Sequence, residues 1–286
     1  MPLHMQSERT TSKALQLEVI EIPNGGFMSD QPTNATIVGA HEVFIIDPGD
    51  AAGVGVIQEV LGRRSDLQVK AILLTHGHPD HATAAPELKR IYDCPVMLNP
   101  KEQPILRQFL NWSDVDEELT DGMTLTIEEG ELQAIDTPGH SPGHIALYEP
   151  VSRTLIAGDL VSGNGTVGIF PPHGKMVEYL ESLERMRQLN PDVVIPGHGP
   201  TMTPPPNIFA QYIEHRLMRE GEIYAVVARE PTTIEAMIPE LYPIVLPHFR
   251  RAAAATVLAH LEKMQAEGRV RPESDNLDTC RWSVRT

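Results

Sequence analysis

The stretch LLTHGHPDHA, residues 73–82, places three histidines and an aspartate within the six positions from His76 to His81. The whole chain has 12 histidines in 286 residues, so this crowding needs a chemical reason. It directly follows the apolar run AILLT (71–75), which is typical of a central strand buried on both faces. The pattern therefore predicts a cluster of ligand-type side chains at the end of a buried strand.

The spacing within this stretch indicates two metal ions rather than one. His76 and His78 stand two residues apart where an extended strand ends, so both side chains can project to the same side. Asp80 and His81 follow Pro79 in a tighter turn, which can direct them to a second point. Four ligands this close together can hardly enclose a single ion, because zinc usually takes about four ligands in a tetrahedral array. Two ions, completed by ligands from elsewhere, are the easier solution.

Three further segments can supply the missing ligands. TPGH (137–140), AGD (157–159) and IPGHG (195–199) each have a glycine beside a ligand-type residue after a β-favouring run. Six terminal ligands and one carboxylate able to bridge suit two ions roughly 3.5–4 Å apart. The predicted metal ligands are His76, His78, Asp80, His81, His140, Asp159 and His198.

Each motif alone has a simpler interpretation. A single His-X-His pair occurs by chance on protein surfaces, His140 alone could be a loop histidine, and Asp159 alone could be a turn or helix cap. We interpret His144, His173 and His248 in that simpler way, as ordinary loop histidines. The four segments occurring together in this order favour the metal site.

The remaining sequence predicts an α/β domain followed by a small helical one. Two β-rich halves, each containing helical stretches, suggest two packed sheets covered by helices on the outside. The Pro-rich segment MTPPPN (202–207) marks a boundary, which divides the chain into domains at 1–204 and 205–286. Beyond it we expect three helices and one short strand, RVRP (269–272). The polar residues 273–286 are expected to be frayed.

Composition restricts the setting of the protein. No window approaches the roughly 18 consecutive apolar residues of a membrane span, and the first residues lack the apolar core of a signal peptide. Cys94 and Cys280 are the two cysteines, which makes a disulfide framework improbable and suits a reducing compartment. We therefore expect a cytoplasmic protein without a membrane partner.

The net charge of −16 is concentrated in one part of the chain. Residues 1–204 contain 13 of the basic and 28 of the acidic residues. Because phosphate binding depends on Lys and Arg, this argues against a broad electrostatic grip on nucleic acid.

The motifs THGHPDH, TPGHSPGH, AGDLV and PGHGP resemble those of the metallo-β-lactamase-fold hydrolase superfamily. The resemblance implies an αββα sandwich with two metal ions at one edge. It assigns His76, His78 and His140 to one metal. It assigns Asp80, His81 and His198 to the other, with Asp159 bridging. IIDPG (45–49) resembles the early strand end of the family, so Asp47 would support the ligands from behind.

The tail narrows the resemblance to a subgroup. Neither cysteine stands in a ligand motif, unlike in common metallo-β-lactamases, and 38 residues between Asp159 and His198 are too few for the domain inserted in some family nucleases. GDLVSGNGTVGIF, YIEHRLMREGEI and LAHLEKMQAEGRV resemble the β-lactamase-like protein 2 group, in which a small winged-helix-like domain follows the sandwich. The similarity covers roughly residues 16–272. That group includes single-strand-specific endoribonucleases, and related chains with a similar tail are thioesterases acting on carrier-bound polyketides.

We expect a dinuclear zinc hydrolase that uses a metal-bridging hydroxide, with Asp80 orienting the nucleophile; manganese or iron would also suit these ligands. Two substrates compete. The whole-chain resemblance, and a last helix that could present Arg250, Arg251 and Lys263, slightly favour single-stranded RNA. The weakly charged segment 162–174 suits the acyl group of a thioester. The tail could instead be a packing or homodimerisation module. A β-lactamase and a non-catalytic binding protein are disfavoured, the latter because all seven ligand positions are filled.

Overall fold

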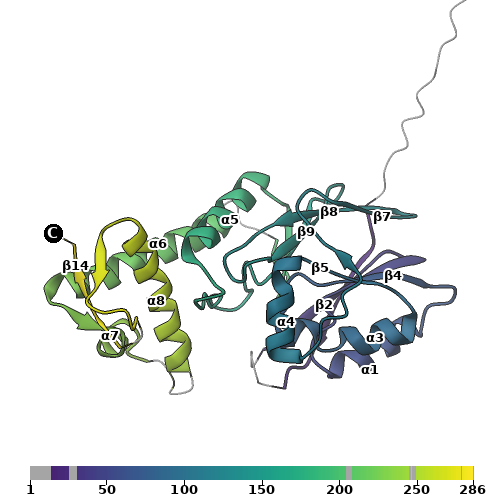
Figure 1. Ribbon diagram of the computed structural model, residues 1–286. Helices are drawn as coiled ribbons and strands as arrows, with labels where there is room; N and C mark the ends of the chain where they lie inside the picture. Colours follow the sequence, from purple (N-terminus) through teal and green to yellow (C-terminus); the bar gives the residue numbers. More distant parts are fainter. Residues whose placement is uncertain are drawn as a thin grey trace, which may run out of the picture.

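The computed structural model of the chain describes residues 14–25, 31–203, 208–244, 246, 249–277 and 279–285. Two β-sheets lie face to face with helices on their outer sides, and a smaller, mostly helical domain extends from one end (Figure 1). This is the αββα sandwich with an appended C-terminal domain that the sequence predicts.

The first sheet has the order β1-β2-β3-β4-β5-β6. Its strands are β1 (Leu17–Ile22), β2 (Thr33–Val38), β3 (Glu42–Ile46), β4 (Gln68–Leu73), β5 (Val96–Leu98) and β6 (Glu117–Glu118). β1 to β3 are antiparallel, and β3 to β6 are parallel. Parallel neighbours need long crossover connections, which here contain helices. These are α1 (Ala52–Leu61), α2 (Pro79–Ala82), α3 (Ala85–Tyr92) and α4 (Gln103–Leu110), the last preceded by the 3-10 turn η1 (Pro100–Glu102).

The second sheet has the order β11-β10-β9-β8-β7. Its strands are β7 (Thr124–Ile127), β8 (Gly130–Asp136), β9 (Ile145–Glu149), β10 (Thr154–Gly158) and β11 (Val193–Pro196). β10 and β11 are parallel, and helix α5 (Met176–Leu189) makes the crossover between them. The other pairs are antiparallel.

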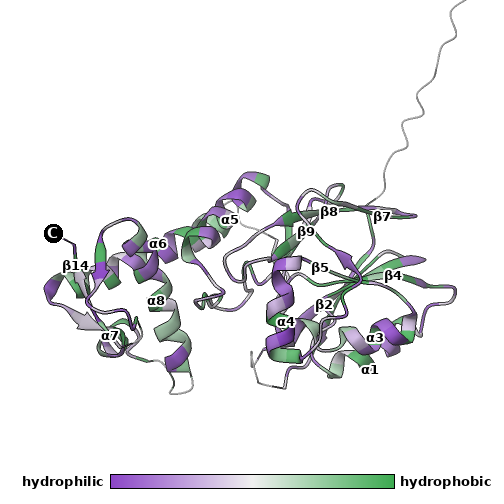
Figure 2. Cartoon of the chain, viewed as in Figure 1, coloured by the Kyte–Doolittle hydropathy of each residue, from purple (hydrophilic) through white to green (hydrophobic). Residues whose placement is uncertain are grey.

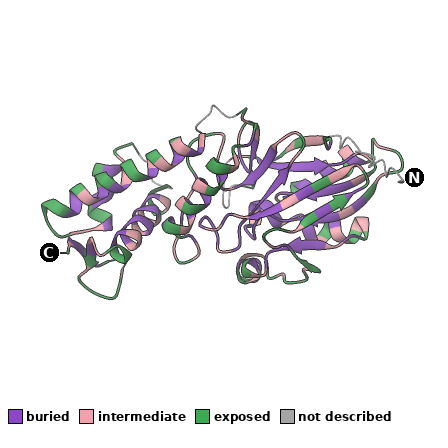
Figure 3. Cartoon of the chain, turned by 90° about the horizontal axis from the view of Figure 1, so that it is seen from above, coloured by how far each residue is buried: buried purple, intermediate pink, exposed green. Residues whose placement is uncertain are grey.

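Side chains on a central strand point alternately to its two faces, so one strand contributes to two apolar layers. In β3, Phe44 and Ile46 pack between the two sheets, whereas Ile45 packs toward the outer helices with Ile57 of α1. This follows from the period of two of an extended strand. Many strand residues are accordingly hydrophobic (green in Figure 2), and most strand residues of the sandwich are buried (purple in Figure 3).

The C-terminal domain has a three-stranded sheet that the sequence pattern did not predict. Its helices are α6 (Ile208–Arg229), α7 (Ile234–Leu241) and α8 (Arg250–Ala266), and its strands are β12 (Thr232–Thr233), β13 (Val270–Pro272) and β14 (Arg281–Val284). β14 is the central strand of this sheet, and Trp282 within it is fully buried. The prediction that residues 273–286 are frayed is therefore wrong for β14. A single Trp in a polar stretch supplies enough apolar area to hold a four-residue strand against a helical core.

The two parts of the chain share an apolar layer. Phe209 and Tyr212 of α6 and Ala259 of α8 belong to the same buried cluster as Tyr179 and Leu183 of α5. The C-terminal domain has a separate core of its own around Trp282. Part of the predicted boundary segment, 204–207, lies outside the described residues, so the division at 204/205 stays a prediction.

Five of the ten basic side chains in residues 205–286 form ion pairs with acidic ones among the described residues. Lys263, which we expected α8 to present, is 10% exposed at its side chain and pairs with Glu220 at 2.8 Å and Glu267 at 2.6 Å. The expectation of a free basic face on α8 is therefore wrong at Lys263. Arg250 pairs with Glu235 at 3.3 Å.

Glu220 is the buried centre of this charge cluster. Its carboxylate contacts Lys263 on α8 and Arg269 just beyond it, and Arg269 stacks over Tyr224. Burial alone would raise the pKa of Glu220, but His260, whose Nδ1 lies 3.9 Å from the carboxylate, and the two cations lower it from 4.5 to about 2. Because the folded pKa lies below the unfolded one, the ionised carboxylate stabilises the fold fully above about pH 4.5. That contribution is lost as the pH falls toward 2.

We expect Glu220→Gln to destabilise the C-terminal domain by about 2 kcal/mol at pH 7. This is less than the roughly 3–5 kcal/mol for a fully buried pair, because the Arg269 side chain is 39% exposed. Urea unfolding followed by Trp282 fluorescence in a Trp112→Phe background would measure it. The difference from the parent should shrink between about pH 4.5 and 2. Glu240→Gln, which breaks an exposed pair with Arg229, should cost less than about 1 kcal/mol. Equal losses in both variants would contradict the prediction.

Among the described residues, no helix has the length and apolar character needed to cross a membrane.

Candidate metal centre

The histidine cluster lies at the edge of the first sheet, where β4 gives way to a one-turn helix. β4 ends at Leu73, and α2 begins at Pro79, whose fixed φ suits the first position of a helix. His76 and His78 lie on the connection before this helix, whereas Asp80 and His81 lie within its turn. The change from extended chain to helix separates the two pairs of side chains, as the spacing predicted.

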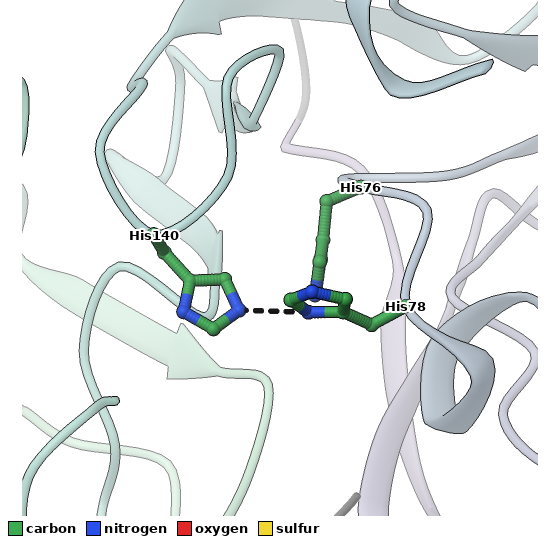
Figure 4. A group of neighbouring side chains, drawn as sticks. All are labelled: His76, His78 and His140. Atoms are coloured by element: carbon green, nitrogen blue, oxygen red, sulfur yellow. Dashed lines mark hydrogen bonds between the residues drawn. The ribbon is translucent and has the colours of Figure 1, made fainter. Parts of the chain in front are cut away.

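The first group joins this connection to the loop after β8. His76, His78 and His140 have ligand atoms within 4.8 Å of one another, and all three residues are buried. Nε2 of His140 lies 2.9 Å from Nδ1 of His78, and the three rings converge from two separate loops (Figure 4). The ring planes of His78 and His140 are nearly perpendicular, at 86°.

The second group consists of Asp80, His81 and His198, again within 4.8 Å of one another and buried. Nε2 of His198 lies 3.3 Å from Nε2 of His81 and 3.4 Å from Oδ2 of Asp80. His198 follows β11 in the second sheet, so this group also joins the two sheets.

Asp159 lies between the two groups. Its Oδ1 is 3.5 Å from Nε2 of His81 and 3.6 Å from Nε2 of His198, and its Oδ2 is 3.6 Å from Nε2 of His140. The approach requires Gly197, because a Cβ there would lie 2.3 Å from Asp159 Oδ1. The structure thus brings all seven predicted residues together, with one carboxylate oxygen facing each group.

Hydrogen bonds on the far side of three rings fix which nitrogen faces the centre. Nδ1–H of His140 donates to the carbonyl of Gly168 at 2.8 Å, and Nδ1–H of His198 donates to the carbonyl of Pro32 at 2.9 Å. Nδ1–H of His81 donates to Oδ2 of Asp47 at 2.9 Å. Each ring therefore directs its Nε2 at the other ligand atoms. This is the usual way in which proteins orient metal-binding histidines.

Asp47 also orients His76 through Thr75. The Thr75 amide donates to Oδ1 of Asp47 at 2.8 Å, and its hydroxyl donates to Oδ2 at 2.7 Å. The hydroxyl proton is therefore used, so Thr75 accepts the proton of His76 Nδ1 at 3.0 Å. Asp47, His76 and His81 also form a third group of ligand-type atoms, but the Asp47 oxygens are already occupied by these donors. Asp47 therefore lies behind His81 and Thr75, on the side away from the other clustered atoms, which is where the resemblance places it.

The donor set fits divalent cations. Two ligands of one tetrahedral zinc, each at roughly 2.0–2.1 Å, are about 3.3 Å apart. Four of the ligand–ligand distances run from 2.9 to 3.6 Å, and the ligand atoms of each group all lie within 4.8 Å of one another. Nε2 of His76 is buried and has no hydrogen-bond partner among the described residues, although it faces the first group. Such an orphaned nitrogen is costly unless a cation accepts its lone pair.

The charges of the site divide its histidines. Burial lowers the pKa of His76 well below its usual value and that of His78 to about 3, so both are neutral and can ligate. Burial opposes charge at His81 as well, but the carboxylates of Asp159 and Asp47 raise its pKa well above the usual value. Burial opposes charge at His198 too, but the carboxylates of Asp159 and Asp80 raise its pKa. A cation at the second group would compete with protons for His81 and His198.

His144 was wrongly interpreted as an ordinary loop histidine. It is fully buried, and its Nε2 accepts the backbone N–H of Asp159 at 3.0 Å. Its Nδ1–H therefore donates to Oγ1 of Thr137 at 2.8 Å. The second Gly-His of TPGHSPGH could have signalled it, since it repeats the first. His173 is half-buried and lies 3.3 Å from Gln108, and His248 lies outside the described residues.

Glu102 is a second supporting residue that the sequence did not signal. It is fully buried, and its carboxylate accepts the backbone N–H groups of Gly77 at 2.9 Å and Gly143 at 2.6 Å. It therefore joins the two loops that carry the first histidine group. Burial raises its pKa, whereas these backbone donors lower it.

Comparisons with known proteins agree with this geometry. Residues 28–198 match the family model of the metallo-beta-lactamase superfamily. Residues 233–282 match the model of the beta-lactamase associated winged helix domain. The chain is 28% identical to a beta-lactamase-like protein 2 homolog of Caenorhabditis elegans, over 91% of this chain and 86% of that one.

Two relatives carry the name of an activity. The chain is 35% identical to a hydroxyacylglutathione hydrolase of Bdellovibrio bacteriovorus, over 64% of this chain and 67% of the relative. It is 28% identical to an atrochrysone carboxyl ACP thioesterase of Aspergillus fumigatus, over 74% of this chain and 65% of the relative.

Solved structures share the fold. A beta-lactamase domain protein from Burkholderia ambifaria superimposes with a TM-score of 0.83 at 22% identity, covering 94% of this chain and 91% of that one. A protein solved in a di-iron-bound form is 31% identical, with a TM-score of 0.53, over 65% of this chain and 94% of that one. The chain therefore belongs to the metallo-β-lactamase superfamily and is a metal-dependent hydrolase with a C-terminal winged-helix domain.

Proposed function

We propose that the chain binds two divalent metal ions through the seven clustered residues. His76, His78 and His140 would hold one ion, Asp80, His81 and His198 the other, and Asp159 would contact both. The observation that carries the proposal is the position of Asp159, whose two oxygens face different groups at 3.5–3.6 Å. We propose zinc as the metal. Nitrogen and oxygen ligands without a thiolate would also accept manganese or iron, and one relative has been solved with iron.

Two divalent cations at such a site would supply an ionised water as the nucleophile. They would also place positive charge next to the carbonyl or phosphoryl oxygen of the substrate. Asp80 would act beside it as the catalytic carboxylate. Burial alone would raise its pKa, but the hydrogen bond from His198 and the charge of His81 hold it below the usual value. Asp80 is therefore ionised at neutral pH and can accept a hydrogen bond from the attacking water. Gly77 and Gly143, held by Glu102, keep the histidine loops at a constant separation.

We propose an acyl thioester as the substrate. Aromatic side chains lie near the histidines. The Phe109 ring is 6.3 Å from the ring of His78. The Phe170 ring packs against Gly168, whose carbonyl accepts the Nδ1–H of His140. Two relatives are named for the hydrolysis of a thioester, a hydroxyacylglutathione hydrolase and an ACP thioesterase.

The charges of the C-terminal domain also support a thioester over RNA. An RNA strand would need unpaired cations to neutralise its phosphates. Instead, each of several basic residues has an acidic partner that weakens the local positive field. The pairs are Arg219–Glu222, Arg229–Glu240, Arg250–Glu235, Lys263–Glu220 and Arg269–Glu267.

Single-stranded RNA remains the second candidate. It is favoured by the similarity to beta-lactamase-like protein 2 homologs, which extends over both domains. A small cleavage site needs no basic surface over the whole protein, because the metal ions themselves attract the reacting phosphate.

A parallel turnover assay separates the two substrates. Zinc-loaded protein and an Asp80→Ala variant would be given a panel of acyl thioesters and a single-stranded RNA oligonucleotide. We expect thioester turnover that falls at least about 10²-fold in the variant. RNA cleavage lost in the variant, without thioester turnover, would establish the second candidate. Turnover of either substrate that survives in the variant would come from a contaminant or another site.

We also propose a cytoplasmic location, which the two free and buried thiols of Cys94 and Cys280 support. A homodimer stays a prediction that sedimentation would test.

A further inference from the structure

The loop after β10 contacts two of the proposed metal ligands. The Gly168 carbonyl accepts Nδ1–H of His140 at 2.8 Å, which fixes the ring of a histidine in the first group. The Gly163 amide donates to the carbonyl of His198 at 2.8 Å. The position of this loop therefore controls how both ligands are presented.

Helix α6 of the C-terminal domain holds this loop at two points. The Tyr212 hydroxyl accepts the amide of Ser162 at 3.0 Å and donates to its carbonyl at 2.6 Å. One turn further along the helix, Arg216 donates through Nη2 to the carbonyl of Val167. Val167 directly precedes Gly168, so Arg216 fixes the peptide plane next to the one that holds His140.

The burial of Arg216 indicates that this contact is specific. The residue is 2% exposed, its guanidinium lies 5.2 Å from the centre of the Tyr179 ring, and Nε has no hydrogen-bond partner among the described residues. Burying an incompletely paired guanidinium costs free energy, whereas an apolar side chain would fill the space without that cost. Gly168 lacks a Cβ and has wide backbone freedom, so its carbonyl needs an external restraint to stay on His140.

We infer that Arg216 is a positioning residue for His140, through which helix α6 sets the affinity of one metal ion of the pair. The inference rests on the proposed metal centre and goes beyond it, because it gives a helix outside the sandwich a role in metal binding. A substitution at Arg216 should weaken the metal held by His76, His78 and His140. It should leave the metal held by Asp80, His81 and His198 unchanged.

Arg219 provides a matched control on the same helix. It also donates to a backbone carbonyl, that of Leu241 at 2.7 Å, and also lies over a tyrosine ring, that of Tyr242 at 4.5 Å. These two partners, and Glu222, with which Arg219 forms an ion pair at 2.8 Å, belong to the C-terminal domain. Arg216→Met and Arg219→Met therefore remove similar interactions. Only the Arg216 interaction reaches the sandwich.

The experiment measures zinc stoichiometry and affinity by competition with a chromophoric chelator. We expect Arg216→Met to bind one of two zinc ions about 10–100-fold more weakly, Arg216→Lys to recover part of the loss, and Arg219→Met to match the wild type. The visible spectrum of the cobalt-loaded protein should change in Arg216→Met. In a His140→Ala background, Arg216→Met should have no further effect on the remaining metal, because the two changes act on one site.

The outcomes distinguish this inference from the metal centre itself. Wild-type affinities for both ions in Arg216→Met, or equal weakening of both, would overturn the inference and leave a packing role. A wild type that does not bind two ions would refute the proposed centre and the inference with it. If Arg216→Met fails to fold by circular dichroism, Arg216→Lys decides. Lysine keeps the positive charge but replaces the guanidinium that donates to the Val167 carbonyl, so it should weaken the same ion to a smaller extent.

Discussion

Replacement of Asp159 by asparagine is expected to lower turnover at least about 10³-fold, or about 4 kcal/mol of transition-state stabilisation. Asp159 faces both groups of the proposed centre, and its charge balances buried histidines on each side. Burial alone would raise its pKa, but His198 and His81 hold the pKa well below its usual value, so the carboxylate is ionised. An asparagine amide has the same shape with no charge, and one of its two terminal atoms is a donor that cannot ligate a cation.

Metal analysis after dialysis, together with turnover of the substrate that the wild type hydrolyses, would measure the effect. The bound metal should fall below two ions per chain. Asp136→Asn is the control, because this carboxylate also ends a strand of the second sheet but lies 3.4 Å from the Asn99 amide. Two retained ions and wild-type turnover in Asp159→Asn would show that the carboxylate does not bridge.

Replacement of Asp47 by asparagine is expected to weaken metal binding about 10–100-fold, although Asp47 ligates neither proposed ion. Its carboxylate accepts three donors: the amide and hydroxyl of Thr75, and Nδ1–H of His81. An asparagine can keep the Thr75 amide on its oxygen, but its NH₂ group faces two donors. Thr75 and His81 would turn, and His76 would follow Thr75. The buried donors should also lower the free energy of unfolding by about 1–3 kcal/mol.

Asparagine is the right replacement because Asp47 has a φ of 47°, a left-handed conformation that asparagine tolerates better than alanine does. Chelator competition measures the affinity, and urea unfolding measures the stability. Asp50→Asn, in the same DPGD turn, is the control, since Asp50 accepts from the amides of Gly25 and Ala51 and should leave the metals unaffected. A wild-type affinity in Asp47→Asn would limit Asp47 to a role in the turn.

The structure brings the seven predicted residues together, and the sequence could anticipate this because their placement is local. Their role as metal ligands stays a prediction. Each follows a β-favouring run and stands at or just beyond its end, and the ends of neighbouring strands meet at one edge of a sandwich. Residue type and spacing therefore carried most of the information about His76, His78 and His140 as neighbours. The same reasoning failed for His144, because its bond to an amide 15 residues away forms only on folding, and the repeated Gly-His was its one local signal.

The sequence by itself determined the sandwich, the appended domain and the identity of the clustered side chains, since strand periodicity and strand-end motifs depend on residues near one another. Only the tertiary structure decided what holds those side chains in place. Glu102 joins two loops 25 and 41 residues away, and Arg216 reaches Val167 across 49 residues. Trp282 turns a polar tail into the central strand of a sheet. These contacts depend on which surfaces meet after folding, and burial makes their hydrogen bonds and charges matter.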